Sequence, residues 1–208
     1  MRKRYIGLLL IIMIMICGAA PALASDDLSV WDSWQSYPQD IMNTKYLIPV
    51  KYLMDKKILT GNTDGLFYPE EGITRAEFAA MMAKATNNTA EIEVVRNENI
   101  FYDLDGYGWA RPYINAVAKK GLFKGRSDDR FSPGESVTYA EVITVIVRMN
   151  TNAESVAEGM AIKWPDNYIL FAQTYNIIGD VEISDWNAPA KKGDAAILLY
   201  RNINKNRR

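Results

Sequence analysis

The sequence predicts an all-α protein built from tandem helix-loop-helix units, and three observations support this prediction. A block of the chain recurs at a constant offset of 64 residues without an internal gap. Apolar residues recur at helical spacing on both sides of each block. Each block also contains a Thr-x-x-Glu capping box, which marks the start of a helix. The matched identities are Gly61/Gly125, Phe67/Phe131, Pro69/Pro133, Thr74/Thr138 and Glu77/Glu141. Such units bury their apolar faces against one another, and they usually bind partners in the grooves between them.

Residues 1–24 are predicted to be a secretory signal peptide. Arg2, Lys3 and Arg4 precede an apolar run that ends at Cys17, and Ala22-Leu23-Ala24 offers a small-x-small cleavage site. A permanent anchor helix is the alternative. It is disfavoured because the apolar run is short for a membrane span and a cleavage site follows it. We therefore expect no membrane attachment after cleavage.

The composition of the remaining chain argues against catalysis and against nucleic-acid binding. Removing residues 1–24 from the 208-residue chain leaves 184 residues with no Cys and no His, 21 Lys and Arg, and 25 Asp and Glu. Nucleic-acid binders carry basic surfaces, which a net charge near −4 does not favour. Without His or Cys, Ser-His and Cys-His catalysis and the usual zinc sites are excluded. No catalytic residue, metal site or cofactor is predicted.

The first unit, residues 25–88, is predicted to hold two helices. Apolar residues within 45–57 share one helical face, and Pro49 fits the first turn of a helix that begins near Ile48. A polar turn and an extended stretch follow. The capping box of Thr74 then opens a second helix, in which the predicted buried stripe is Phe78, Met81, Met82 and Ala85.

The second unit, residues 89–152, repeats this order. Its first helix is predicted over 109–120, with Pro112 in the first turn and Gly121 near the end. The capping box of Thr138 opens the second helix. The predicted buried stripe of that helix is Val142, Val145, Ile146 and Met149.

The third unit, residues 153–208, is predicted to be a degenerate copy. A polar linker spans 150–163, and Trp164-Pro165-Asp166 opens a helix. Pro189 stands within about a residue of the position held by Pro69 and Pro133, and Asp194 stands where the capping Glu stood. Lys191 replaces the capping Thr, so we expect the last helix to be less stable by roughly 1 kcal/mol at that end.

The stretch from Gly61 to Pro69, followed by Ile73-Thr74-Arg75-Ala76-Glu77-Phe78, resembles the S-layer homology (SLH) domain. Phe101-Tyr102-Asp103 and Trp109-Ala110 resemble the opening of a second module. The resemblance covers nearly the whole chain after the signal peptide and is strongest in the first two units. It implies three modules arranged with pseudo-threefold symmetry around a central helical core. It also implies that an anionic, pyruvylated secondary cell-wall polysaccharide binds in the grooves between modules.

The resemblance makes Arg75 the leading candidate for contact with this ligand. Residue chemistry agrees, because a guanidinium beside the free amides of a helix start would bind a carboxylate. The alternative is a structural salt bridge from Arg75 to Glu71 or Glu77. Tyr139 and Lys192 occupy the equivalent position in the other units, and Lys192 keeps the charge without the guanidinium fork. We therefore expect at most one groove with the full cationic element, between the Arg75 loop and the first helix of the second unit.

The predicted ligand-binding set has five residues, which are Arg75, Asp103, Trp109, Gly125 and Lys192. Asp103 would hydrogen-bond to sugar hydroxyls and Trp109 would stack on a sugar face. The alternatives are a helix cap for Asp103 and core packing for Trp109. Trp164 and Trp186 are predicted to be packing residues.

The predicted function is non-covalent attachment of a secreted protein to cell-wall polysaccharide, in the cell wall or S-layer. The alternative is an assembly module that has lost most glycan binding and that contacts other cell-surface proteins. A wall-acting hydrolase is a remote third reading, because the acids that stand out lie in capping boxes or turns.

Overall fold

The computed structural model describes residues 37–86 and 89–205, and Pro38–Arg208 form one compact unit. The predicted signal peptide lies outside the described residues. Within them the chain is helical, with three isolated β-bridges and no strand, so the all-α prediction is confirmed. None of the described helices combines the length and the apolar character that crossing a bilayer requires. The elements are η1 (Gln39–Ile41), α3 (Leu47–Asp55), α4 (Arg75–Thr86), α5 (Thr89–Val94), α6 (Arg111–Lys119), α7 (Tyr139–Arg148), α8 (Thr151–Glu158), α9 (Asp166–Thr174) and α10 (Lys192–Lys205).

The short helix α8 lies in the segment 150–163 that was predicted to be a polar linker, and no helix was predicted over the residues of α5. In α8, the side-chain oxygen of Asn150 accepts hydrogen bonds from the amides of Asn152 and Ala153 at 3.0 and 3.2 Å. Ala157 of α8 is fully buried, and Ile92 of α5 is 8% exposed. Helix α8 thus has both a side-chain cap and a buried apolar residue, and α5 has one buried apolar residue, Ile92.

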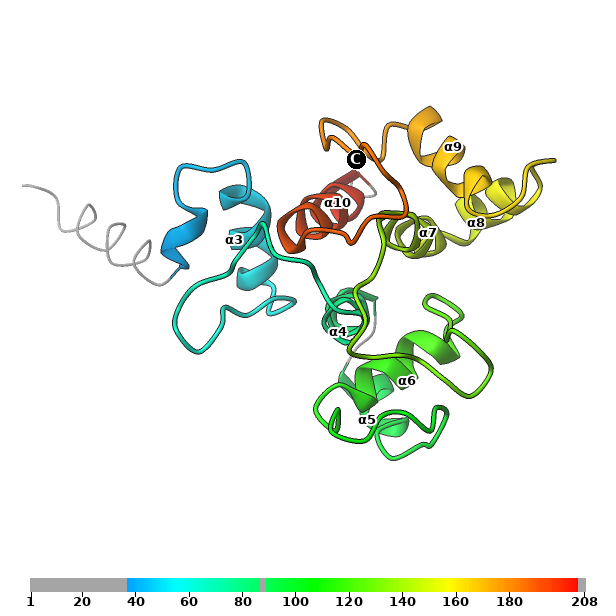
Figure 1. Ribbon diagram of the computed structural model, residues 1–208, viewed down its shortest axis with the longest axis horizontal. Coiled ribbons are helices and arrows are strands. Elements are labelled where there is room, and N and C mark those ends of the chain that lie inside the picture. Colours follow the sequence, from blue (N-terminus) through cyan, green and yellow to red (C-terminus); the bar gives the residue numbers. More distant parts are fainter. Residues whose placement is uncertain (1–36, 87–88, 206–208) are drawn as a thin grey trace, which may run out of the picture. The chain divides into compact units, whose positions relative to one another are not determined.

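Helices α4, α7 and α10 lie together in the middle of the compact unit, and α3, α6 and α9 lie outside them (Figure 1). The predicted stripe of α4 is too narrow, because burial extends around the helix to Ala76, Ala79, Ala80 and Ala83. Ala85, in contrast, is only partly buried. A central helix has neighbours on several sides, and its small alanine side chains allow these neighbours to approach closely. A single apolar stripe would cover only one such contact.

The core helices pack in a cyclic order. Helix α4 of the first unit packs against α6 of the second, α7 of the second against α9 of the third, and α10 of the third against α3 of the first. Each core helix thus supports the outer helix of the following unit. The contact between α10 and α3 closes the series. The predicted threefold symmetry itself stays a prediction.

A ring of backbone hydrogen bonds joins the three loops that precede the core helices. The amide of Ile73 donates to the carbonyl of Ala190 at 3.0 Å, that of Ala190 to Val137 at 2.8 Å, and that of Val137 to Ile73 at 3.1 Å. Ala190 of the third unit therefore takes part in this ring in the same way as Ile73 and Val137 of the first two units.

The same pattern of bonds corrects the alignment of the third unit. The amide of Ala76 donates to the carbonyl of Pro133, and the amide of Gly193 donates to the carbonyl of Pro69. The equivalent amide of Ala140 donates to Trp186. Trp186 therefore takes the place of the two prolines, and the proposed match with Pro189 is wrong by three residues.

Candidate ligand-binding grooves

Two grooves in the surface have matching walls. Groove A is lined by Thr60, Gly61, Glu77, Lys84, Trp109 and Lys192. Groove B is lined by Lys124, Gly125, Arg126, Glu141, Arg148 and Trp164. Four residues of each groove occupy equivalent positions 64 residues apart, namely Thr60/Lys124, Gly61/Gly125, Glu77/Glu141 and Lys84/Arg148. The duplication of the sequence has thus produced two similar sites.

Each groove exposes one face of an indole. Trp109 and Trp164 are each 54% exposed, and each directly precedes the N-cap residue of an outer helix. The indole N–H of Trp164 donates to Thr144 Oγ1 at 2.9 Å, which fixes the orientation of its ring. The prediction that Trp164 is a packing residue is therefore wrong, and Trp109 is a surface residue rather than part of the core. A fixed, half-exposed indole offers a flat apolar face of the kind that sugar rings stack on.

Arg75 is sealed inside the protein and does not line either groove. It is 1% exposed, and its Nη1 lies 2.6 Å from Glu141 Oε1. Its Nε and Nη2 donate to the carbonyls of Phe131 and Lys124 at 2.8 and 2.9 Å. Its guanidinium carbon lies 4.4 Å from the ring centre of Phe123. The salt-bridge alternative thus describes its environment, although the partner is Glu141 of the following unit rather than Glu71 or Glu77.

The charge of Arg75 survives this burial. Desolvation lowers the pKa of Arg75 to about 10, while the adjacent Glu141 carboxylate opposes that shift. The guanidinium is therefore charged at neutral pH, and Glu141 neutralises it inside the protein.

The backbone amides beside Arg75 are also occupied. The amide of Arg75 donates to the carbonyl of Glu135 at 2.8 Å, and the amide of Ala76 to that of Pro133 at 3.0 Å. The side chain of Thr74 accepts the amide of Glu77 at 3.2 Å. The expectation of free amides at this helix start is wrong, because the neighbouring unit supplies carbonyls to it. Arg75 therefore has neither the open surface nor the free donors on which the predicted direct contact depended.

The residues equivalent to Arg75 make the same kind of contact. Tyr139 Oη donates to Asp194 Oδ2 at 2.6 Å, and Lys192 Nζ lies 3.4 Å from Glu77 Oε1. In each case the residue at the start of a core helix pairs with the carboxylate of the next unit. We call Arg75–Glu141, Tyr139–Asp194 and Lys192–Glu77 the inter-unit pairs.

The structure brings Trp109 together with Lys192, not with Arg75. Both residues line groove A, where the side chain of Lys192 is 13% exposed. Arg75 instead points to α7 and forms the wall behind groove B, through the carbonyl of Lys124 and the carboxylate of Glu141. The predicted pairing of the Arg75 loop with Trp109 is therefore corrected, since the two residues belong to different grooves.

Asp103 holds a loop and lines neither groove. Its carboxylate accepts the amides of Phe131 and Ser132 at 2.9 and 2.7 Å. Asp40 of the first unit accepts the amide of Phe67 at 3.0 Å in the same way. Asp103 is thus neither a helix cap nor part of a groove wall, and it fixes the Phe-x-Pro stretch.

Gly125 lines groove B and cannot carry a side chain there. A Cβ atom at this position would lie 2.4 Å from the carbonyl oxygen of Ser127 and 2.6 Å from that of Arg130. The tight turn therefore requires glycine, which leaves the backbone itself as the groove wall.

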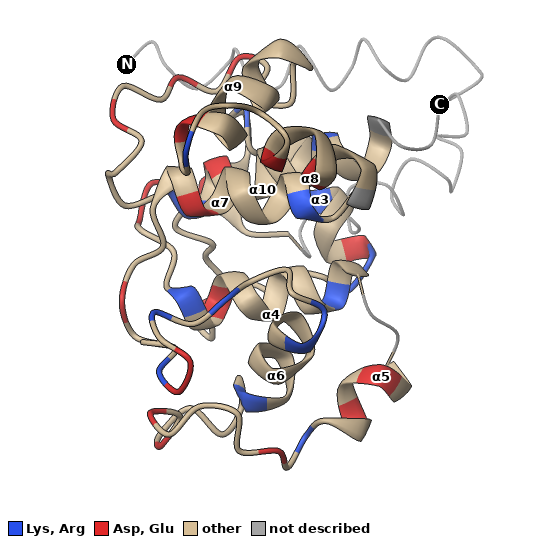
Figure 2. Ribbon diagram, turned by 90° about the vertical axis from the view of Figure 1, so that its right-hand side faces the viewer, with Lys and Arg blue, Asp and Glu red and all other residues tan. Residues whose placement is uncertain are grey.

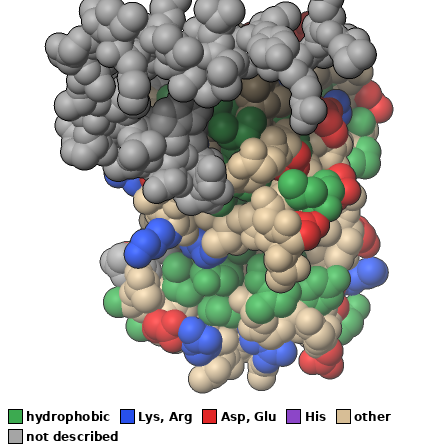
Figure 3. Space-filling view, turned by 90° about the vertical axis from the view of Figure 1, so that its left-hand side faces the viewer, with side chains coloured by type: hydrophobic (Ala, Val, Ile, Leu, Met, Phe, Trp, Pro, Cys, Tyr) green, Lys and Arg blue, Asp and Glu red, His purple; other side chains and the backbone are tan. Residues whose placement is uncertain are grey.

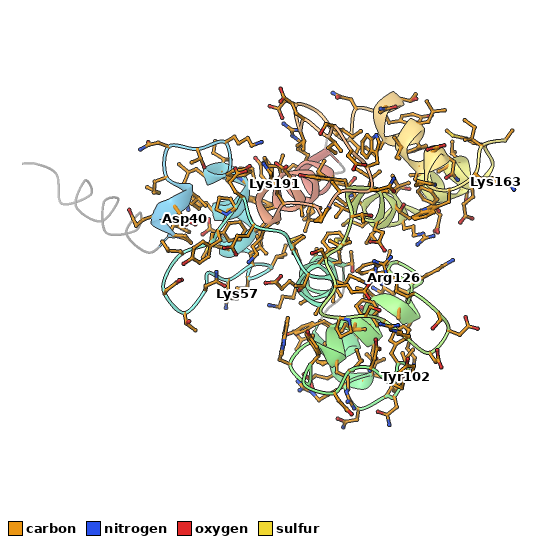
Figure 4. The ribbon with its side chains drawn as sticks, in the orientation of Figure 1. Asp40, Lys57, Tyr102, Arg126, Lys163 and Lys191 are labelled. Carbon is orange, nitrogen blue, oxygen red and sulfur yellow. The ribbon has the colours of Figure 1, made fainter. Side chains whose placement is uncertain are left out.

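Sequence reasoning missed the basic residues that line the grooves from the core helices. Lys84 and Arg148 each lie seven residues after the capping Glu, and their 64-residue offset was a signal that could have identified them. Arg148 Nε lies 3.2 Å from Glu154 Oε1. Arg126 Nη1 donates to Glu141 at 2.7 Å, and Arg126 lies between α6 and α7 (Figure 4).

Lys84 differs from these two arginines. Within residues 37–86 and 89–205 it has no carboxylate partner, and its Nζ lies 5.2 Å from the ring centre of Tyr113. Burial alone lowers the pKa of Lys84. Elsewhere, charges of both signs are intermixed over the compact unit (Figure 2), and one face sets apolar side chains next to Lys or Arg (Figure 3).

Interlocked helical units around a core of three helices define a helical-repeat protein. Residues 40–79 and 100–143 match the family model described as "S-layer homology domain". The chain thus carries S-layer homology domains in these two segments, as its motifs predicted. The third unit lies outside both matched segments.

Three relatives illustrate where such segments occur. The chain is 35% identical over 100 residues to a cellulosome-anchoring protein of Acetivibrio thermocellus, covering 48% of this chain and 22% of the relative. It is 30% identical over 150 residues to a middle cell wall protein of Brevibacillus brevis, covering 72% of this chain and 14% of the relative. It is 27% identical over 148 residues to an endoglucanase of a Bacillus species, covering 70% of this chain and 15% of the relative.

The chain spans 14% to 22% of the length of these relatives. The family match and the relatives indicate a structural cell-surface protein that is secreted and associated with the cell wall or S-layer.

Proposed function

We propose that the protein attaches non-covalently to an anionic, pyruvylated secondary cell-wall polysaccharide, with grooves A and B as its binding sites. The observation that carries this proposal is the duplication of one constellation. A half-exposed indole, a basic side chain and a glycine turn occur together at two equivalent places. The names of the relatives from Acetivibrio thermocellus and Brevibacillus brevis support attachment to the wall.

The chemistry of the grooves suits such a ligand. The exposed faces of Trp109 and Trp164 would stack on sugar rings. Basic side chains would form charge-assisted hydrogen bonds with the carboxylate of a pyruvate ketal. Of the residues predicted from the sequence, Trp109, Gly125 and Lys192 remain in the proposed site. Arg75 and Asp103 are proposed as positioning residues, because both act through protein contacts rather than through an open surface.

Co-sedimentation with purified wall sacculi tests this proposal. The wild-type protein is expected to sediment with native sacculi and to stay in solution with sacculi from which mild acid has removed the pyruvate ketals. The double variant Trp109→Ala/Trp164→Ala is expected to lose retention. Because both indoles are exposed, this variant should fold, which circular dichroism can verify.

Equal retention on native and acid-treated sacculi would overturn the proposed dependence on the pyruvate ketal, and no retention on either would favour a protein-interaction module. Retention by the double variant would show that the grooves are not the sites. Release of soluble sugar from purified wall would contradict a purely binding role.

A further inference from the structure

We infer that Asp105 isomerises spontaneously to isoaspartate through a cyclic imide with Gly106, and that this modification displaces the indole of Trp109 in groove A. The sequence contains two Asp-Gly steps, Asp64-Gly65 and Asp105-Gly106. An Asp-Gly step favours this reaction because glycine has no Cβ atom to obstruct the ring that forms. The hydrogen bonds around the two steps distinguish them.

At the second step, both reacting groups are open to solvent. The side chain of Asp105 is 99% exposed, and Arg111 Nη2 lies 3.7 Å from its Oδ1. Within residues 37–86 and 89–205, the Asp105 carboxylate accepts no hydrogen bond and the amide of Gly106 donates none. Gly106 has a φ of +81°, and a Cβ atom there would meet no atom within 4 Å. The amide nitrogen and the carboxyl carbon can therefore approach each other without breaking a hydrogen bond.

At the first step, the same two groups are held. Gly65 shares the φ of +81° and the empty surroundings of Gly106. The two carboxylate oxygens of Asp64, however, accept the amide of Leu66 at 3.0 Å and the hydroxyl of Tyr68 at 2.6 Å. The amide of Gly65 donates to the carbonyl of Asn62 at 3.0 Å. These three hydrogen bonds oppose ring closure at Asp64, so this step is an internal control.

The reaction needs no partner other than water. The amide nitrogen of Gly106 bonds to Cγ of Asp105, and one carboxylate oxygen leaves as water with the amide proton and one proton from solvent. Water then adds to the five-membered imide and breaks one of its two C–N bonds, which returns the solvent proton. Cleavage at Cγ restores aspartate. Cleavage at the main-chain carbonyl carbon leaves the chain running through Cβ and Cγ, which is isoaspartate. Nothing is oxidised or reduced.

The position of this step connects it to groove A. The amide of Tyr107 donates to the carbonyl of Leu104 at 3.0 Å and closes the turn that contains Asp105 and Gly106. Isoaspartate lengthens the main chain of this turn by one atom. The side chain of Leu104 is 1% exposed and holds the start of the turn in the core. The added length must therefore be taken up after Leu104, in the short segment that leads to Trp109.

The experiment ages the purified protein in mildly acidic buffer at physiological temperature. Isoaspartate at each step is quantified by peptide mapping, with protein isoaspartyl methyltransferase labelling as the second measure. The indole N–H signals of Trp109 and Trp164 are followed by NMR and are assigned by their absence in Trp109→Phe and Trp164→Phe. The test variants are Asp105→Glu, which blocks the reaction, and Tyr68→Phe, which removes one hydrogen bond from Asp64.

Isoaspartate should form at Asp105 at least about 10-fold faster than at Asp64, because the three hydrogen bonds of the Asp64 step resist ring closure. Tyr68→Phe should raise the rate at Asp64 and leave the rate at Asp105 unchanged. Asp105→Glu should not react at this position, because its imide would need a six-membered ring, which closes more slowly.

The indole of Trp109 should report the modification directly. A second Trp109 signal should grow in proportion to isoaspartate, while the signal of Trp164, in groove B, stays single. Asp105→Glu should show one Trp109 signal throughout. Equal rates at the two steps, or a faster rate at Asp64, would overturn the assignment of Asp105. Isoaspartate at Asp105 with an unchanged Trp109 signal would overturn its effect on groove A. Neither result depends on whether the grooves bind polysaccharide.

Discussion

The side chain of Arg75 connects three parts of the chain. It joins α4 to Glu141 of α7 and to two carbonyls of the intervening loop. A buried guanidinium with these partners is costly to disturb, because its removal leaves the carbonyls of Phe131 and Lys124 without their donor and takes from Glu141 one of its two cationic partners. The sequence indicated that Arg75 was special, but it could not show whether the charge faced a ligand or the next unit. That distinction depends on which core helix lies opposite, which no local pattern specifies.

Arg75→Met should therefore lower the free energy of unfolding by about 3–5 kcal/mol, as expected when one partner of a buried ion pair is removed. Urea denaturation of the purified protein measures this change. Arg96→Met is the matched control, because Arg96 and Glu93 form an exposed pair whose loss should change stability by less than about 1 kcal/mol. A similar small effect for both variants would show that the Arg75 cluster contributes little.

Two buried tyrosines make stability sensitive to alkaline pH. Burial raises the pKa of Tyr46 and of Tyr139, and hydrogen bonds to Glu70 and Asp194 raise them further. Since the folded pKa exceeds the unfolded value near 10, the folded state holds these protons longer. Their contribution to the free energy of unfolding is complete below about pH 10, the unfolded pKa of tyrosine, and it is lost as the pH rises above that value.

Over that range each tyrosine should reduce the free energy of unfolding by about 1.4 kcal/mol per pH unit. Tyr139→Phe should show a correspondingly shallower decline than the wild-type protein in urea unfolding between about pH 9 and 11. Parallel declines in the two proteins would contradict the assignment to Tyr139.

Helices differ in how well the sequence predicts them. The core helices α4 and α7 carry capping boxes and long apolar runs, so both were predictable. The sequence did not predict that these helices are buried on several sides, because an alanine in an apolar pattern does not show whether its face of the helix is buried. The helices α5 and α8 escaped prediction because their segments are polar, and packing against α6 and α9 stabilises them. The weak cap of α10 is offset by carbonyls of the first unit, since Glu71 and Pro69 accept the amides of Lys192 and Gly193 at 2.8 Å.

The start of α10 approaches the first unit too closely for a side chain at Gly193. A Cβ atom there would lie 2.5 Å from a ring carbon of Tyr46 and 2.8 Å from Cβ of Pro69. Glycine to alanine usually stabilises a helix by about 1 kcal/mol. Here we expect Gly193→Ala to destabilise the protein by about 1–3 kcal/mol, because overpacking outweighs helix propensity.

Thermal or urea unfolding measures this effect, with Gly108→Ala as a control at a glycine whose added Cβ would meet no atom within 4 Å. A more stable Gly193→Ala protein would show that α10 and the first unit are less tightly joined.

At the scale of the whole molecule, the repeat was evident in the sequence but its connectivity was not. The 64-residue offset identified equivalent residues without showing which unit lies next to which. The predicted site therefore paired Trp109 with Arg75. The cyclic packing instead places Trp109 beside Lys192 in groove A, and it places Arg75 behind the wall of groove B. Groove A depends on this order, because it combines residues of all three units, whereas groove B combines residues of the second and third units only.

The return contact of α10 onto α3 has a consequence for how such a chain can evolve. An open solenoid can lengthen by tandem duplication, since a new copy stacks on a free terminal surface. Here the last copy already covers the surface on which a fourth would stack. Additional copies would have to form a separate ring or break this one. A single unit can nevertheless accumulate substitutions, because its contacts with the two neighbouring units keep it in place.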